Sequence, residues 1–173
     1  MSWKEVITVF GSPKIQKNKK WKRCNEYIIE FEKTLDAKTN EERVNVCDAR
    51  FAKFRADKNS LITLRIYNAK KSQWEHKIEH KCGGFAPVIY EVGCLATPNG
   101  FDENINIVRG KGIHFFDCLL AAYWFSIVRL KEDIEFSENG EIKRIYHSNS
   151  TLTHFLQGFG LFDPKFATNF LVN

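Results

Sequence analysis

The chain lacks long apolar runs and a paired set of cysteines. None of its segments approaches the roughly 20 apolar residues that cross a bilayer, and the N-terminus MSWKEVITVF has no basic region followed by a long apolar stretch. The five cysteines are an odd number without Cys-x-x-Cys spacing, which argues against a disulfide framework and a four-thiolate zinc site. We therefore expect a protein of a reducing compartment that is not secreted and has no membrane span.

Complete catalytic and nucleotide-binding motifs are also missing. No Gly-x-Ser-x-Gly nucleophile elbow occurs, and Gly110-Lys111-Gly112 does not match a phosphate-binding loop. That loop requires a first glycine six positions before the lysine and a Ser or Thr after it. We therefore predict no cofactor and no catalytic residue from a motif alone, while Cys–His and Ser–His pairs formed by the fold stay open.

A metal site is the other chemistry that the sequence only partly suggests. His76, His80 and Cys82 have the spacing His-x3-His-x-Cys, which could supply three zinc ligands from a helix. The alternation in residues 74–80 instead favours a strand, on which residues four apart are separated by about 13 Å. No fourth ligand is adjacent, so we predict no metal.

What the chain does contain is a hydrophobic core with several strand patterns. Hydrophobic residues make up 43% of the 173 positions, and phenylalanine alone occurs 15 times, which is enough for one domain over residues 1–173. Strand-like segments occur at 26–32, 60–67, 87–92 and 113–116, and an Asn-Gly turn is expected between 134–136 and 142–146. Within 60–67, alternation predicts Ile62, Leu64 and Ile66 on one buried face.

One strongly apolar helix is predicted after these strands. Asp117 has the side chain of an N-cap, and the run Cys118–Val128 is apolar at every position except Ser126, as expected for a helix buried all round. At the C-terminus a phenylalanine stripe recurs at spacings of four, three, four and four, and forms either a lid over the core or a surface for a second copy: Phe155, Phe159, Phe162, Phe166 and Phe170. The predicted fold is α+β, a mixed or antiparallel sheet of five to seven strands with one buried central helix and a Phe-rich C-terminal helical lid.

A basic segment spans residues 13–23, PKIQKNKKWKR. It contains no acidic residue and supplies seven candidate binding residues: Lys14, Lys17, Lys19, Lys20, Trp21, Lys22 and Arg23. Such a segment is typical of a surface that attracts nucleic acid, anionic lipid or an acidic protein, with Trp21 able to stack on a base. The alternative is a solvated loop, partly neutralised by the acidic residues that follow it.

The stretch GKGIHFF, residues 110–116, places a histidine inside a predicted strand. His114 is either a core residue that donates to a backbone carbonyl or a functional imidazole at a strand end. In the second case Arg109 and Lys111 beside it could attract a phosphate or a carboxylate.

The central part of the chain resembles a family of uncharacterised proteins from giant DNA viruses and some phages. The similar segments are Tyr90-Glu91-Val92-Gly93, Pro98-Asn99-Gly100-Phe101-Asp102, and Gly112 to Phe116 followed by an alanine-containing helix. Phe54-Arg55-Ala56-Asp57 before SLITLRIY resembles an upstream unit of the same family. This resemblance implies a viral source and a location in the host cytoplasm or the virion, and implies no known activity.

A second resemblance is to poly(ADP-ribose) polymerase-type transferases. GKGIHFFD is similar to their GKGIYFAD segment, so that His114 would take the place of a tyrosine that stacks on the nicotinamide of NAD. Asn25-Glu26-Tyr27-Ile28-Ile29 resembles their catalytic-glutamate segment and implies a role for Glu26. The two segments stand in reverse order here, which would require a circular permutation.

We expect from these observations a viral, non-enzymatic binding or virion-associated protein. Its partner would be an acidic protein or nucleic acid, contacted through the basic and aromatic residues. The alternative is an NAD-binding protein similar to ADP-ribosyltransferases, active or inactive, with His114 and Glu26 at its site.

Overall fold

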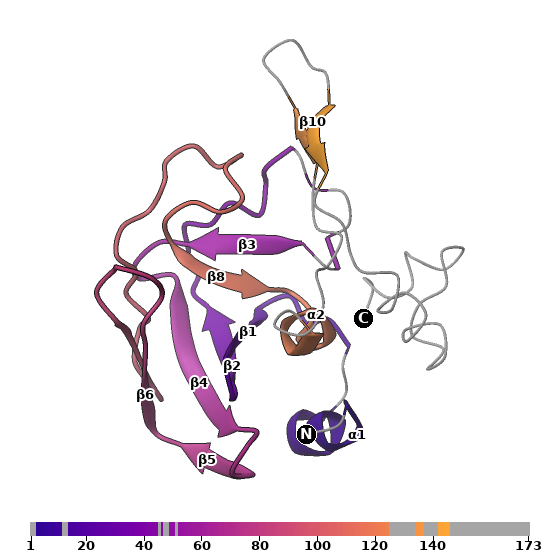
Figure 1. Ribbon diagram of the computed structural model, residues 1–173, viewed down its shortest axis with the longest axis vertical. Coiled ribbons are helices and arrows are strands. Elements are labelled where there is room, and N and C mark those ends of the chain that lie inside the picture. The colour runs from indigo at the N-terminus through magenta and orange to yellow at the C-terminus, as the bar shows by residue number, and fades with distance from the viewer. Residues whose placement is uncertain are drawn as a thin grey trace.

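The main feature of the fold is an antiparallel sheet with strand order β3-β8-β1-β2-β4-β5 (Figure 1). The computed structural model describes residues 3–11, 14–44, 46, 49–50, 52–124, 134–136 and 142–145. The strands of this sheet are β1 (Lys19–Cys24), β2 (Tyr27–Lys33), β3 (Lys53–Ala56), β4 (Leu61–Asn68), β5 (Gln73–Glu75) and β8 (Ile113–Phe116). The predicted α+β class and the predicted number of strands are confirmed.

Two hairpins and two helices complete the described structure. The remaining elements are α1 (Trp3–Phe10), β6 (Lys77–His80), β7 (Val88–Glu91), α2 (Leu119–Trp124), β9 (Ile134–Phe136) and β10 (Ile142–Ile145). Strands β9 and β10 pair antiparallel, as the Asn-Gly turn predicted, although residues 139 and 140 lie outside the described part. Among the described residues, no helix combines the length and hydrophobicity required to cross a bilayer.

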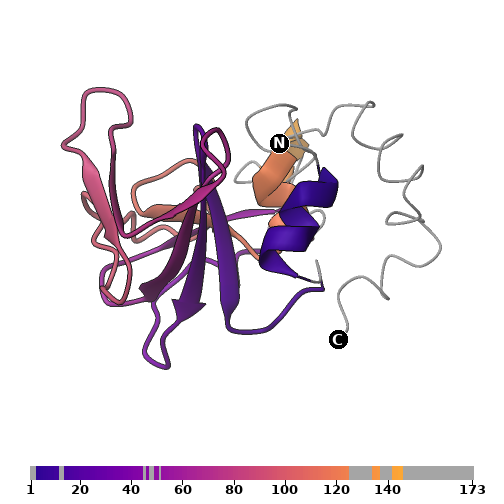
Figure 2. The same cartoon turned by 90° about the horizontal axis from the view of Figure 1, so that it is seen from below.

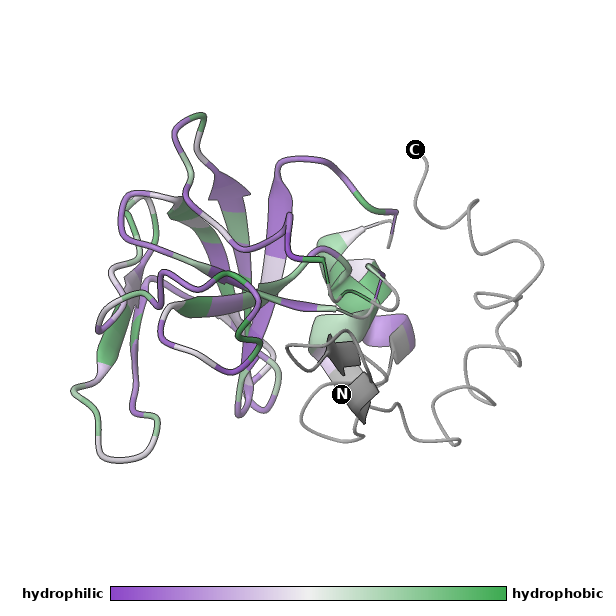
Figure 3. Cartoon of the chain, turned by 90° about the horizontal axis from the view of Figure 1, so that it is seen from above, coloured by the Kyte–Doolittle hydropathy of each residue, from purple (hydrophilic) through white to green (hydrophobic). Residues whose placement is uncertain are grey.

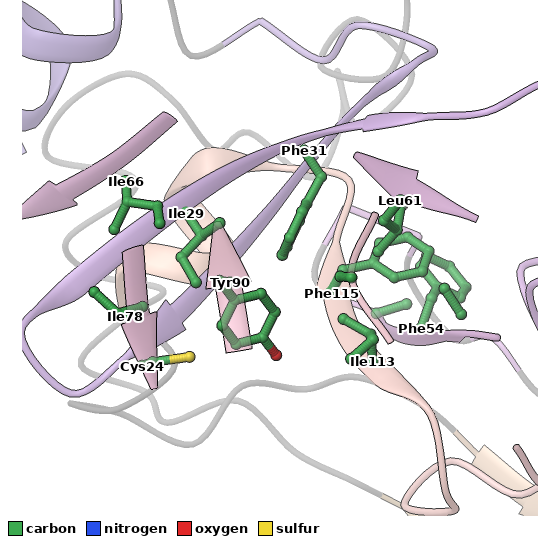
Figure 4. Packing of buried hydrophobic residues seen from close by; sticks show 13 residues of the cluster. Cys24, Ile29, Phe31, Phe54, Leu61, Ile66, Ile78, Tyr90, Ile113 and Phe115 are labelled. Atoms are coloured by element: carbon green, nitrogen blue, oxygen red, sulfur yellow. The ribbon is translucent and has the colours of Figure 1, made fainter. Parts of the chain in front are cut away.

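The two faces of the sheet carry separate hydrophobic clusters, and Figure 2 shows the helices on one side of the sheet and the β6–β7 hairpin on the other. On one face, α1 and α2 pack on Trp21, Ile28 and Phe116. On the other face, the hairpin of β6 and β7 inserts Ile78 and Tyr90 against the sheet, and Figure 4 shows the Tyr90 ring among the surrounding aliphatic and aromatic side chains. The sheet is therefore the middle layer between two helices and a hairpin.

The strand predictions in the middle of the chain are confirmed, but one prediction about faces is not. Strand β4 has a register irregularity opposite Glu30 and Phe31, where Arg65 and Thr63 are consecutive partners and Leu64 is the extra residue. A bulge of this kind shifts the alternation by one residue. As a result Leu61 and Thr63 are buried before the bulge and Ile66 after it, while Ile62 and Leu64 are only half-buried.

The start of helix α2 also differs from the prediction. The helix begins at Leu119, so that Cys118, whose thiol is fully buried, and not Asp117 occupies the capping position. Burial raises the pKa of that thiol to about 11. The predicted burial is confirmed from Leu119 to Tyr123, and the phenylalanine stripe of the predicted C-terminal lid lies outside the described residues.

Only the first part of the basic segment is open chain as the sequence suggested, because residues 19–23 belong to strand β1. Figure 3 shows that the strands carry both hydrophilic and hydrophobic residues, and the sequence of β1, KKWKRC, is of this mixed kind. Trp21 is 6% exposed and meets the Phe10 ring edge-on at 5.3 Å between ring centroids. The expectation that Trp21 stacks on a base is therefore wrong.

Candidate binding site at the start of strand β8

The loop that leads into β8 is organised by one buried arginine. Arg55 on β3 is fully buried, and its guanidinium donates to four loop carbonyls: Ile107 at 2.8 Å, Lys111 at 2.7 Å, Asn104 at 3.0 Å and Asp102 at 3.2 Å. The Phe101 ring lies 5.0 Å from the guanidinium carbon. A loop with no ladder partner thus has its carbonyls satisfied by a side chain, as buried backbone groups require.

Both glycines of the GKG segment are required by this loop, for different reasons. The Asp102 carboxylate accepts the Lys111 N–H at 2.6 Å, and a Cβ at Gly110 would collide with that carboxylate. Gly112 has φ +143°, and a Cβ there would lie 3.0 Å from Arg55 Cβ and 3.1 Å from the Ala56 carbonyl oxygen. The glycines therefore let the loop approach Asp102 and β3.

His114 holds the same loop from β8. Its Nε2 donates to the Gly110 carbonyl at 2.8 Å, which confirms the predicted hydrogen bond to a backbone carbonyl. Burial, together with the nearby Lys53 and Lys22 charges, lowers the pKa of His114 to about 3. The imidazole is therefore neutral at pH 7. The backbone carbonyl of His114 accepts a hydrogen bond from Lys22 Nζ at 3.1 Å.

A cavity of about 340 Å³ lies beside this loop and the β6–β7 hairpin. Of the described residues that line it, three are cationic, Lys22 from β1 and Arg109 and Lys111 from the loop, and one is a carboxylate, Asp102. Its apolar lining comes from Phe85, Ala86, Val88, Tyr90 and Ile113. The structure thus brings together four of the residues singled out in the sequence, namely Lys22, Arg109, Lys111 and His114, at an electropositive cavity with an apolar wall.

The other residues of the basic segment have different surroundings. Lys19 pairs with Glu30 at 2.8 Å, and Arg23 donates to the Tyr123 carbonyl at 2.6 Å. Lys14 and Lys17 are exposed on the chain before β1. The seven predicted binding residues therefore do not share one surface, and of them only Lys22 lines the cavity at β8.

Lys20 belongs to a second cavity, of about 690 Å³, at the other end of β8. Its ammonium lies 2.7 Å from Glu41 and 2.5 Å from Asp117, and Lys33 binds the second Glu41 oxygen at 2.7 Å. Burial and the neighbouring Glu41 raise the pKa of Asp117 to about 6, against the attraction of Lys20. Burial opposes the ionisation of Glu41, but the two lysines outweigh it and lower the pKa of Glu41. Two lysines and two carboxylates balance at this site.

The remaining sequence candidates lie apart from these cavities or touch only one of them. Glu26 is in the turn between β1 and β2 and does not line the cavity at β8, whereas His80 and Cys82 do. His76 lies 3.5 Å from a Glu91 carboxylate oxygen. Within the described residues, no three His, Cys, Asp or Glu side chains come together as a metal site.

Sequence reasoning missed Arg55, Asp102 and the aromatic wall of Phe85 and Tyr90. Arg55 and Asp102 occur in segments noted only for their resemblance to the viral family, and no spacing links either to the loop. No protein-family model, curated protein or solved structure matches the chain. The resemblances to a viral family and to ADP-ribosyltransferases therefore stay predictions.

Proposed function

We propose that this chain is a non-enzymatic binding protein that accepts an anionic group of an acidic partner in the cavity at the start of β8. The observation that carries the proposal is the convergence of Lys22, Arg109 and Lys111 on one cavity. Among the described residues that line it, the one carboxylate is that of Asp102, and it is engaged with the loop backbone. Cations gathered in a concave site raise the local concentration of anions and bind phosphate or carboxylate by charge-assisted hydrogen bonds.

The neutral state of His114 supports a binding role. With its Nε2 proton donated to Gly110, the imidazole serves to hold the loop, and the low pKa leaves it without a charge. The transferase alternative needs His114 and Glu26 at one dinucleotide, and Glu26 is not among the residues that line the cavity. The geometry therefore favours the binding role, while the viral source and the location in host cytoplasm or virion stay predictions.

Phosphorus NMR and calorimetry test the proposal with inorganic phosphate and acetate as separate probes. We expect saturable binding of at least one anion that weakens as salt rises, since exposed charges are screened. Lys22→Gln and Lys111→Gln should each weaken binding about fivefold or more. Lys17→Gln is the matched control, because Lys17 is exposed and lines the other cavity. The absence of saturable binding, or an equal loss in the control, would contradict the proposal.

A further inference from the structure

The cavity at β8 has two chemically different ends. Its cations come from β1 and from residues 109–111, whereas its apolar residues come mainly from the β6–β7 hairpin and the connection between its strands. Phe85 in that connection is 58% exposed, although it is a large aromatic side chain. The Asn99 amide donates to the Ala86 carbonyl at 2.6 Å and fixes the connection next to the loop.

An inorganic anion would leave this apolar wall in water. Burying an aromatic side chain is favourable, and a flat ring on the ligand would cover Phe85 while its anionic group reaches the lysines. The size of the cavity limits such a ligand: about 340 Å³ lies at the small end of the roughly 300–1,000 Å³ range of small-molecule sites. One ring system with one anionic group fits this volume better than a dinucleotide such as NAD.

Polar side chains beside the apolar wall further restrict the ring. His80 and Asn99 both line the cavity, and His80 is half-buried at the end of β6. Burial, then the charge of Lys22, lowers the pKa of His80, so its imidazole is neutral and offers one donor and one acceptor. A nucleobase edge uses both kinds of group, whereas the phenyl ring of a phosphotyrosine uses neither.

Building on the proposed function, we propose that the cavity binds a nucleoside monophosphate. The base lies against Phe85 within reach of His80 and Asn99, and the phosphate lies toward Lys22, Arg109 and Lys111. The partner of the site is then a free mononucleotide or a terminal nucleotide, with the phosphate giving affinity and the base adding to it.

The experiment compares adenosine monophosphate, inorganic phosphate and a short phosphotyrosine peptide on the full chain. The free energy gained by stacking a base on an aromatic ring is similar to the free energy of a tenfold change in affinity. The monophosphate should therefore bind about tenfold tighter than phosphate. Phe85→Ala should remove most of this advantage and leave phosphate binding within twofold. Ile89→Ala is the matched control, since Ile89 is 45% exposed on β7 and does not line the cavity.

The outcomes separate this inference from the proposed function. Equal binding of phosphate and adenosine monophosphate, or tighter binding of the phosphotyrosine peptide, overturns the nucleotide assignment and leaves the anion site standing. An unchanged monophosphate preference in Phe85→Ala, with an unchanged melting temperature, also overturns it. Failure of all three probes to bind overturns both proposals.

Discussion

The two ends of strand β8 use lysines from the same short strand in opposite ways. Lys20 and Lys22 are two residues apart on β1 and therefore point to the same face. At the end of β8, Lys20 meets Glu41 and Asp117. At the start, Lys22 meets a backbone carbonyl and a cavity with other cations. Whether a lysine stabilises the fold or remains available for a ligand thus depends on which acids the rest of the chain brings to it.

Removing the Arg55 side chain should have the largest effect on stability, and it should act at only one of the two ends of β8. Arg55→Ala removes the side-chain donor of four loop carbonyls at the start of β8, of which those of Asn104 and Lys111 keep a backbone donor. The substitution does not touch the Lys20 network at the other end. Since hydrogen bonds to charged groups contribute about 1.5–3 kcal/mol each and do not add fully, we expect a loss of about 4 kcal/mol of unfolding free energy in urea denaturation.

Arg65→Ala is the control for this prediction. Arg65 pairs with Glu30, and its side chain is 37% exposed, so its loss should cost no more than half as much. Equal losses of unfolding free energy for the two variants would show that Arg55 has no special role in the loop.

Exchanging the two lysines of β1 for methionine sharpens the comparison. Lys20→Met leaves two half-buried carboxylates with one lysine, and we expect a loss of about 3 kcal/mol of unfolding free energy with anion binding within threefold of the original. Lys22→Met should change the unfolding free energy by less than about 1 kcal/mol and weaken phosphate binding fivefold or more. Two variants with the same phenotype would remove the distinction between the two ends.

The smallest net effect on the original protein is expected from pH, because the contributions at the two ends of β8 have opposite signs and partly cancel. The folded pKa of Asp117, about 6, is raised above 3.8, so its stabilisation is present below pH 3.8 and is lost as pH rises through 6. The folded pKa of His114, about 3, is lowered below 6.5, so its contribution to stability increases as pH rises from 3 to 6.5.

Melting temperatures at pH 4 to 6.5 measure these two contributions. The difference between the original protein and Asp117→Asn should fall across this range, and the difference from His114→Gln should rise. Parallel slopes for the two differences would contradict the assigned protonation states.

Local patterns in the sequence were sufficient to predict the central strands. They were insufficient for elements that are stabilised by ion pairs between residues far apart in the sequence. SLITLRIY and IHFF form strands because their β-branched and aromatic residues favour extended backbone. The lysine-rich strand β1 could not be predicted, since it is stabilised by Glu41 and by Asp117, 97 residues from Lys20 in sequence. The carboxylate of Asp117 pairs with Lys20, and α2 begins two residues later, at Leu119.

The candidate site was predictable only in part, for a related reason. Arg109, Lys111 and His114 are neighbours in sequence, so their shared location needed no knowledge of the fold. The apolar wall comes from a hairpin that starts more than 30 residues earlier, so its place beside the loop could not be predicted from spacing. Outside the site, helix α1 is only eight residues long, which is too short for its periodicity to be decisive. Arg55 gave no signal, because its partners are carbonyls that every residue carries.

The way Arg55 holds its loop separates what can vary there from what cannot. Its guanidinium contacts main-chain oxygens of residues 102, 104, 107 and 111, which are present whatever side chains those positions carry. Substitutions at solvent-facing positions of this loop can therefore accumulate while the backbone keeps its path. An inserted or deleted residue would move these oxygens out of hydrogen-bonding position relative to the planar guanidinium. The length of the segment is therefore constrained far more tightly than its composition.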